Sequence, residues 1–157
     1  MSIKTILVST DFSEYAQVAL EEACELAELL NASLHVLHVQ DESSLRIAIK
    51  ESLLDTCQTD EEIRAAVERL TQERFARMFA QANCALADIT HLSRRGEAAA
   101  QTLAYARQIA ADMIVIGRRG EGVLSNLLAS VLGSVAEAII RKSPCPVLLV
   151  RRDHRKS

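Results

Sequence analysis

The sequence predicts an α/β protein with an open, five-stranded parallel sheet of the doubly wound type. Short runs rich in Val, Ile and Leu recur along the 157-residue chain, as in strands that are covered on both faces. Between these runs lie stretches with apolar residues at helical spacing. Strands that are joined through a helix are parallel, and right-handed crossovers place the helices on both faces of one sheet.

The first half of the chain contains one clear strand–helix–strand unit. A strand is expected at residues 5–9, and an amphipathic helix should follow at 13–30, with Asn31 as its stop. A second strand at 33–39 completes the unit. Residues 41–59 mix apolar and charged side chains, which favours irregular structure or a broken helix.

The second half repeats the alternation. Thr59 and Glu62 have the spacing of a capping box, which predicts that a long amphipathic helix begins there. The remaining elements are expected in this order: a strand at 88–93, a helix at 97–110, a strand at 113–116, a helix that begins near 133–134 and ends near 142, and a last strand at 146–150.

The length and the composition predict one domain, at residues 1–152, followed by a basic flexible tail at 153–157. The chain is 49% hydrophobic and carries a net charge of -3, so it can bury a core, and no basic patch indicates a nucleic-acid partner. It has no apolar run long enough to span a bilayer, and its start runs directly into a strand without a signal peptide. We therefore expect a cytoplasmic protein with no membrane partner.

The cysteines and histidines show no pattern of a metal or redox site. The four cysteines are far apart, with no Cys-x-x-Cys pair and no clustered histidines, which argues against a zinc site or a thioredoxin-like motif. We expect buried or incidental thiols in a reducing compartment: Cys24, Cys57, Cys84 and Cys145. Three histidines follow or lie in strands and are interpreted as packed residues, not bases: His35, His38 and His91.

Four of the five glycines lie after the fourth strand, between Gly117 and Gly133. In doubly wound sheets, ligands bind beyond the carboxyl ends of the strands, where the strand order reverses. Glycine lets backbone N–H groups approach an anion, and a helix that begins near Gly133 would direct its free N–H groups to the same place. The segment therefore predicts a polyphosphate site, although it matches neither a P-loop nor the Gly-x-Gly-x-x-Gly motif.

A purely structural interpretation of the same residues stays open. Gly117 and Gly120 could only form a tight turn, and Ser134 could only cap the last helix, with Glu137 completing a capping box. For Ser134 taken alone we expect the capping role. The concentration of glycine at one strand end favours the phosphate site.

Several segments together resemble the universal stress protein family. They are Ile-Leu-Val-Ser-Thr-Asp-Phe-Ser at 6–13, Leu-His-Val at 37–39, Ile-Val-Ile-Gly-Arg-Arg-Gly at 114–120, Gly-Ser-Val at 133–135 and Pro-Val-Leu-Leu-Val at 146–150. The resemblance covers essentially the whole chain. It implies a Rossmann-like sheet related to the adenine nucleotide alpha hydrolases, with strand order 3-2-1-4-5, and it implies ATP as ligand, with Mg²⁺ carried by the phosphates.

The glycine segment departs from the family pattern in its length. ATP-binding members carry Gly-x-x-Gly, then nine residues, then Gly-Ser or Gly-Thr, whereas twelve residues separate Gly120 from Gly133 here. The three extra residues are close to one helical turn, so they either lengthen a short helix and return Gly133 to the phosphates or displace it. Ser9 stands where members often have proline, and its contact in the family is chiefly through the backbone.

By position, the resemblance assigns a site to this sequence. Asp11 and the backbone of Val39 would flank the adenine, next to Ser9 and Thr10. The ribose would lie by Ile116 and Gly117, and the phosphates would be held by Gly117, Arg118, Arg119, Gly120, Gly133, Ser134 and Val135. Asp11 could also be a helix N-cap with Glu14 at the third helical position, and the two arginines could simply be solvated.

Two hypotheses for the function follow. The first is an ATP-binding regulatory protein of the stress response with at most slow ATP hydrolysis, because no nucleophile with a base and an oxyanion site is recognised. The second is a stress protein that acts without nucleotide, through protein contacts. The resemblance also implies a homodimer through the last strand, whose apolar edge needs cover; the sequence names no other protein partner.

Overall fold

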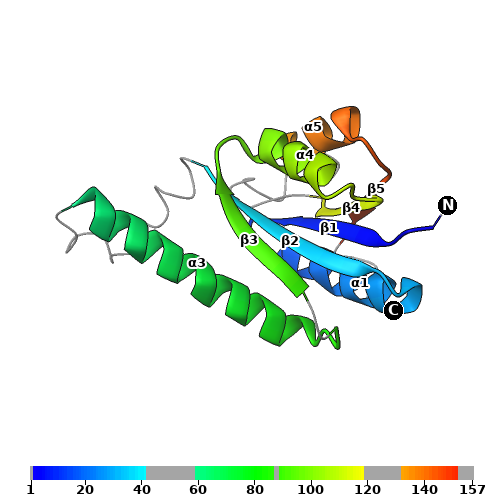
Figure 1. Cartoon of the computed structure of the whole chain (residues 1–157), viewed down its shortest axis with the longest axis horizontal. Helices are drawn as coiled ribbons and strands as arrows, with labels where there is room; N and C mark the ends of the chain where they lie inside the picture. Colours follow the sequence, from blue (N-terminus) through cyan, green and yellow to red (C-terminus); the bar gives the residue numbers. More distant parts are fainter. Residues whose placement is uncertain (1, 42–58, 87–88, 119–131, 152–157) are drawn as a thin grey trace.

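In the part of the chain that the structure describes, five parallel strands form one open sheet, whose arrangement Figure 1 shows. The computed structural model describes residues 2–41, 59–86, 89–118 and 132–151. The sheet order is β3-β2-β1-β4-β5, and every neighbouring pair is parallel, which confirms the predicted fold class and strand order. The strands are β1 (Thr5–Thr10), β2 (Ser33–Gln40), β3 (Ile89–Arg95), β4 (Met113–Gly117) and β5 (Val147–Val150). The order reverses between β1 and β4, which places the crevice for a ligand at their carboxyl ends.

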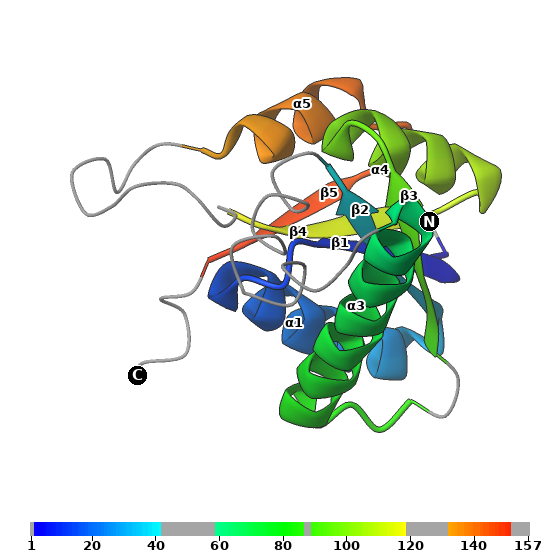
Figure 2. The ribbon, with the colours of Figure 1, turned by 90° about the vertical axis from the view of Figure 1, so that its left-hand side faces the viewer.

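Helices cover both faces of the sheet, so that the sheet is the middle one of three layers (Figures 1 and 2). One face carries α1 (Glu14–Leu30) and α3 (Asp60–Ala82), and the other carries α4 (Ala98–Gln108) and α5 (Ser134–Lys142). Side chains of a strand alternate between the faces, so Ile6 and Val8 of β1 pack toward α1 while Leu7 packs toward α4 and α5. All three are fully buried.

Capping residues explain why α1 and α3 begin, and why α1 ends, where the sequence predicts. The Ser13 hydroxyl accepts a hydrogen bond from the Ala16 amide at the start of α1, and Asn31 ends that helix in the left-handed region with φ 50°. Thr59 and Glu62 form the predicted capping box reciprocally at the start of α3. Residues 42–58, within the stretch predicted to be irregular, lie outside the described residues.

Four of the described strands extend further than predicted at their carboxyl ends, whereas β5 ends at Val150 as predicted. Thr10, Gln40 and Gly117 are each the last residue of a strand, one position beyond the predicted end. β3 lies at Ile89–Arg95, shifted toward the C-terminus of the predicted range. Polar residues and a glycine, which are uncommon in buried strands, hid the continuation in the sequence. The ladder to a neighbouring strand nevertheless continues through Thr10 and Gln40 and through Gly117.

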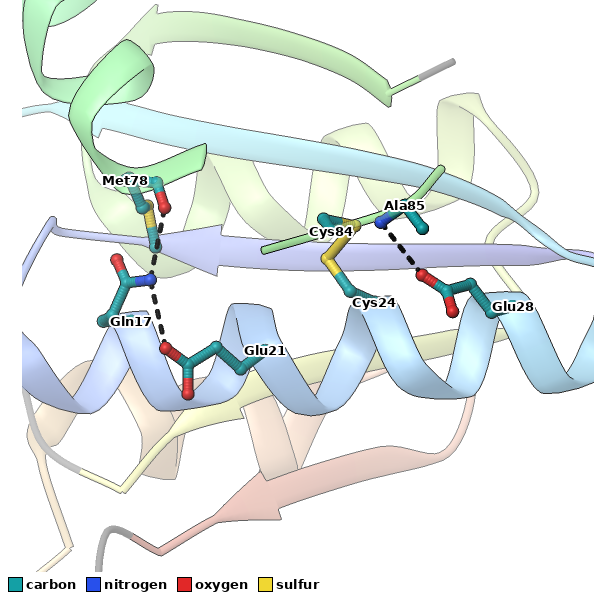
Figure 3. Close-up of a disulfide and its surroundings, with 7 residues drawn as sticks. All are labelled: Gln17, Glu21, Cys24, Glu28, Met78, Cys84 and Ala85. Carbon is teal, nitrogen blue, oxygen red and sulfur yellow. Dashed lines mark hydrogen bonds between the residues drawn. A yellow bond between two sulfur atoms is a disulfide. The ribbon is translucent and has the colours of Figure 1, made fainter. Parts of the chain in front are cut away.

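The expectation of four separate thiols is wrong for two of them. Cys24 in α1 forms a disulfide with Cys84, which follows α3, and their Cα atoms are 5.7 Å apart (Figure 3). The two residues meet because α1 and α3 pack on the same face of the sheet, and a sequence separation of 60 gave no local signal of the pairing. Cys145 is a free, half-buried thiol, and Cys57 lies outside the described residues.

The described residues contain neither a membrane-spanning helix nor a cluster of metal-ligand side chains. No helix among them has the length and the apolar character needed to cross a membrane. In the same part of the chain, His, Cys, Asp and Glu side chains form no group of three that could hold a metal ion.

Candidate functional site

The carboxyl end of β4 lies directly against the first turn of α1. A Cβ atom on Gly117 would come within 2.7 Å of the Tyr15 carbonyl oxygen and 2.8 Å of its carbonyl carbon. Real Cβ atoms do not approach backbone so closely, so only glycine permits this contact. Gly117 therefore has a packing role that brings the end of β4 to the start of α1 (Figure 2).

The turn between β1 and α1 is fixed by its own side chains. The Thr10 hydroxyl accepts a hydrogen bond from the Phe12 amide (3.0 Å) and donates one to the Met78 sulfur (3.4 Å). The Asp11 carboxylate accepts a hydrogen bond from the Ser13 amide at 3.0 Å. Phe12 has φ 63°, in the left-handed region that bulky residues avoid, so the surrounding contacts must hold it there.

His38 supports this turn from β2. Its Nδ1 lies 2.9 Å from the Thr10 carbonyl oxygen, and because a carbonyl only accepts, the imidazole donates from Nδ1. Its ring lies 4.5 Å from the ring of Phe12, which also makes an edge contact of 5.0 Å with Phe75. Burial lowers the pKa of His38, with the Thr10 hydrogen bond opposing this shift. The packing interpretation of His38 is therefore confirmed, and its position next to the predicted site is new.

Asp11 is not the N-cap of α1. The N-cap is Ser13, which has an extended backbone and accepts from the Ala16 amide. The capping interpretation of Asp11 with Glu14 is therefore wrong, because the helix begins two residues later than that interpretation requires. Asp11 is half-buried and turns its carboxylate toward the Ser13 amide instead.

The two described ends of the glycine segment meet. The Gly133 amide donates a hydrogen bond to the Arg118 carbonyl (3.2 Å), and the Arg118 amide donates one to the Val150 carbonyl (3.1 Å). Gly133 therefore returns to the carboxyl end of β4 despite the three extra residues. Arg119 and Gly120, with the rest of 119–131, lie outside the described residues.

The start of α5 has no side-chain cap. Its N-cap is Gly133, in an extended conformation, and Ser134 is the first helical residue. The expectation that Ser134 caps this helix with Glu137 is therefore wrong: Ser134 lies one position too late, and Glu137 pairs with Arg141 at 2.9 Å. Side chains cap the other three described helices: Ser13, Thr59 and Glu97.

The other predicted residues lie at the same edge of the sheet. The Ser9 hydroxyl lies 3.0 Å from the Thr102 hydroxyl of α4. The side chains of Val39 and Ile116 are buried in the core on the side of α4 and α5, so a ligand at this edge could reach them chiefly through their backbone. Val135 is 39% exposed at the start of α5.

The structure also contains a cavity of about 310 Å³ that the sequence interpretation missed. It lies where β2, β3 and the start of α3 meet, and it holds none of the predicted site residues. The available signal was Asp41, which directly follows β2, and Arg95, the last residue of β3. The lining residues are Gln40, Asp41, Asp60, Ile63, Arg64, Val67 and Arg95.

Comparison with known proteins agrees with this architecture. The model of the universal stress protein family matches residues 2–151. The universal stress protein YxiE of Bacillus subtilis is 32% identical over 160 residues, covering 93% of this chain and 97% of that protein. Among solved structures, that of MJ0577, from Methanocaldococcus jannaschii, has a TM-score of 0.75 at 26% identity and covers 98% of this chain and 99% of that one.

Two further neighbours were solved with nucleotides. A universal stress protein in complex with cAMP has a TM-score of 0.59 at 22% identity, covering 96% of this chain and 98% of that one. A universal stress protein from Archaeoglobus fulgidus in complex with dAMP has a TM-score of 0.61 at 21% identity, covering 95% and 98%. These two likenesses show the shared fold.

Proposed function

Because the chain belongs to the universal stress protein family, we propose that it is an ATP-binding regulatory protein of the stress response. The observation that carries this proposal is the hydrogen bond from the Gly133 amide to the Arg118 carbonyl. It brings the start of α5 to the carboxyl end of β4, at the edge where the strand order reverses. Ligands of doubly wound sheets bind at this place.

The start of α5 suits the phosphates. A helix leaves its first N–H groups without intrahelical partners and carries a partial positive charge at that end. Because no side chain caps α5, the amides of Ser134 and Val135 are suited to bind an anion. In this proposal they hold the phosphates together with residues 117–120 and 133, and Mg²⁺ binds through the phosphates.

The turn between β1 and α1 suits the base. Its geometry is fixed by Thr10, Phe12 and His38 before any ligand arrives, so little ordering cost accompanies binding. In this proposal Asp11 and the backbone of Val39 flank the adenine, with Ser9 and Thr10 beside them, and the ribose lies by the backbone of residues 116–117.

The structure supports regulation more than rapid chemistry. His38 is the histidine beside the turn, and its Nδ1 is engaged by the Thr10 carbonyl while its ring is buried. A general base must reach the proton that it abstracts, which this histidine does not do from Nδ1. We therefore propose at most slow ATP hydrolysis.

Two experiments test whether the protein binds a nucleotide and which one. Protein purified without added nucleotide is heated, and the released small molecules are separated by chromatography; the nucleotide-free protein is then titrated with ATP, cAMP and dAMP in a calorimeter. We expect ATP to bind with the highest affinity, because only its polyphosphate reaches the start of α5. Absence of binding by all three would overturn the proposal. Tighter binding of cAMP or dAMP than of ATP would mean that the ligand of this protein is a nucleoside monophosphate.

A second candidate is a cytoplasmic homodimer that acts without nucleotide. β5 forms an edge of the sheet, and the apolar side chains of Val147, Leu148 and Leu149 are only half-buried. An exposed apolar edge is a template for pairing with another strand. We propose that β5 pairs with a second copy of this chain in both candidates, and only the first requires ATP.

A further inference from the structure

The disulfide holds the C-terminal end of α3 against α1 (Figure 3). Cys84 directly follows Asn83, the C-cap of α3, and Cys24 lies in the middle of α1. Two hydrogen bonds accompany the disulfide: Gln17 Nε2 donates to the Met78 carbonyl (3.2 Å), and the Ala85 amide donates to a Glu28 carboxylate oxygen (3.1 Å).

This end provides most of the attachment of α3 to the main core. Phe75 and Met78, in its C-terminal half, are buried in the same cluster as α1. In the N-terminal half, Ala66 and Val67 are buried in a small separate cluster. A helix with few buried apolar contacts depends on each remaining link for its position.

The same end of α3 supports the turn between β1 and α1. The Met78 sulfur accepts the hydrogen bond from the Thr10 hydroxyl at 3.4 Å, and the Phe75 ring makes an edge contact with Phe12 at 5.0 Å. Phe12 is the residue held at φ 63°. The disulfide and the turn are therefore connected through two side chains of one helix.

We propose that Cys24 and Cys84 are a thiol–disulfide exchange site that a dithiol reductant opens, and that opening it loosens the end of α3 and the turn at 10–13. The oxidised form holds both in place. The further consequence, that reduction weakens nucleotide binding, rests on the proposed function.

The exchange follows from the unequal exposure of the two cysteines. Cys24 is 3% exposed, whereas Cys84 is half-buried, so a thiolate of the reductant attacks the Cys84 sulfur. The bond between the two protein sulfurs breaks, and Cys24 leaves as a thiolate that takes up a proton. The second thiol of the reductant then attacks the mixed disulfide and releases Cys84 as a thiol. Two electrons pass to the protein, and the reductant becomes a disulfide.

Opening the disulfide removes a link that joins residues 60 positions apart in the chain. The end of α3 is then held by its apolar packing and two hydrogen bonds, so local opening becomes more frequent. Because Thr10 and Phe12 contact this end, the turn loses part of the support that keeps Phe12 in the left-handed region.

The experiment uses the full chain with Cys57→Ser and Cys145→Ser, so that only the two paired cysteines react. Alkylation without denaturant should label no cysteine before treatment with dithiothreitol and both cysteines after it. Hydrogen exchange of the native protein, read by mass spectrometry, should be roughly tenfold faster at 75–85 in the reduced form and about threefold faster at 10–13. The same chain with Cys24→Ala and Cys84→Ala as well should resemble the reduced form and should not respond to dithiothreitol.

A disulfide that opens only when the protein unfolds would overturn the proposal, and so would reduction without faster exchange at both segments. Reoxidation with oxidised glutathione should restore the slow exchange. A titration with ATP then tests the consequence: we expect about threefold weaker binding in the reduced form, and equal affinity in both forms would overturn the coupling to nucleotide. If ATP binds neither form while exchange still changes, the proposed function fails and the exchange site stands.

Discussion

The Gly133 amide and the Arg118 carbonyl are joined by a hydrogen bond of 3.2 Å across the segment 119–132. Leu132, immediately before Gly133, packs against the core on the side of α4 and α5. These two contacts fix the point at which the chain re-enters the sheet edge. The length of the intervening segment is therefore compatible with a start of α5 that lies at the end of β4.

Shortening the segment should not improve the site. Deleting residues 130–132, which restores the usual family spacing, removes the packing of Leu132 and pulls Gly133 away from Arg118. We expect ATP affinity to fall about tenfold, equivalent to roughly 1.4 kcal/mol of lost interaction. Titration calorimetry measures the change, and Leu132→Ala in the full-length segment separates the lost packing from the shortening. An increase in affinity on deletion would mean that the extra residues obstruct the site.

Placing a carboxylate at the start of α5 should change stability and binding in opposite directions. Gly133 has φ -65°, which any residue adopts, so Gly133→Asp provides the missing N-cap and stabilises the protein by roughly 0.5 kcal/mol. The same carboxylate occupies the proposed phosphate position, and ATP affinity should fall about tenfold. Gly133→Asn is the matched control, because it caps the helix without the charge. Equal ATP affinities of the Asp and Asn variants would argue against phosphates at this helix end.

Most of the fold could be predicted because its signals are local. The αL stop at Asn31 and the capping box of Thr59 and Glu62 are short-range patterns, and both appear in the structure. Strand order followed from the family resemblance. The strand ends were less predictable, because Thr10 and Gln40 take part in the ladder through neighbours that are distant in sequence.

The contacts within the candidate site could not be predicted, because they join distant parts of the chain. Nothing near Gly117 in the sequence indicates that the Tyr15 backbone would fill the space of its side chain. The same holds for His38 with Thr10 and for Cys24 with Cys84. The capping role expected for Ser134 and the one left open for Asp11 rest on spacing alone, and a shift of one or two residues in the helix start is enough to exclude both.

Gly117→Ala should destabilise the fold itself. The new Cβ would lie 2.7 Å from the Tyr15 carbonyl oxygen, and relief requires α1 to move away from β4. We expect a loss of about 1–3 kcal/mol in the free energy of unfolding, measured by denaturant titration. Because the closest atoms belong to backbone, Tyr15→Ala in the same chain should not restore stability. Recovery in the double variant would show that the Tyr15 side chain is the obstacle.

The stability of the protein should fall in mild acid because of His38. Burial lowers the pKa of His38 from 6.5. Just below pH 6.5, His38 therefore binds a proton in the unfolded chain but not in the folded protein. Stability is therefore unaffected by this group above pH 6.5, falls as the pH decreases toward the folded pKa, and levels off below it. The slope is at most about 1.4 kcal/mol per pH unit, measured as the free energy of unfolding at several pH values.

The variant His38→Asn tests whether His38 causes this loss of stability in mild acid. The asparagine amide can still donate to the Thr10 carbonyl but does not titrate. We expect a flatter pH dependence in the variant. His35 is the control, because burial also lowers its pKa and its Nδ1 lies 2.9 Å from the Tyr105 hydroxyl, on the other face of the sheet. A pH dependence unchanged by His38→Asn but removed by His35→Asn would assign the effect to that face.

Leu149→Pro should separate assembly from folding at β5. The Pro146 and Val150 carbonyls accept hydrogen bonds from the β4 side, so by the alternation of a strand the Leu149 amide points away from β4, toward the open edge. Proline at this position removes an outward N–H while leaving the ladder to β4 intact, as edge strands tolerate. The variant should stay folded by circular dichroism but be monomeric by light scattering, whereas we expect the wild type to be a dimer at micromolar concentration. Leu148→Pro is the matched control, because its amide faces β4 and its loss should unfold the edge. A wild-type monomer, or a dimer that survives Leu149→Pro, would exclude pairing through β5.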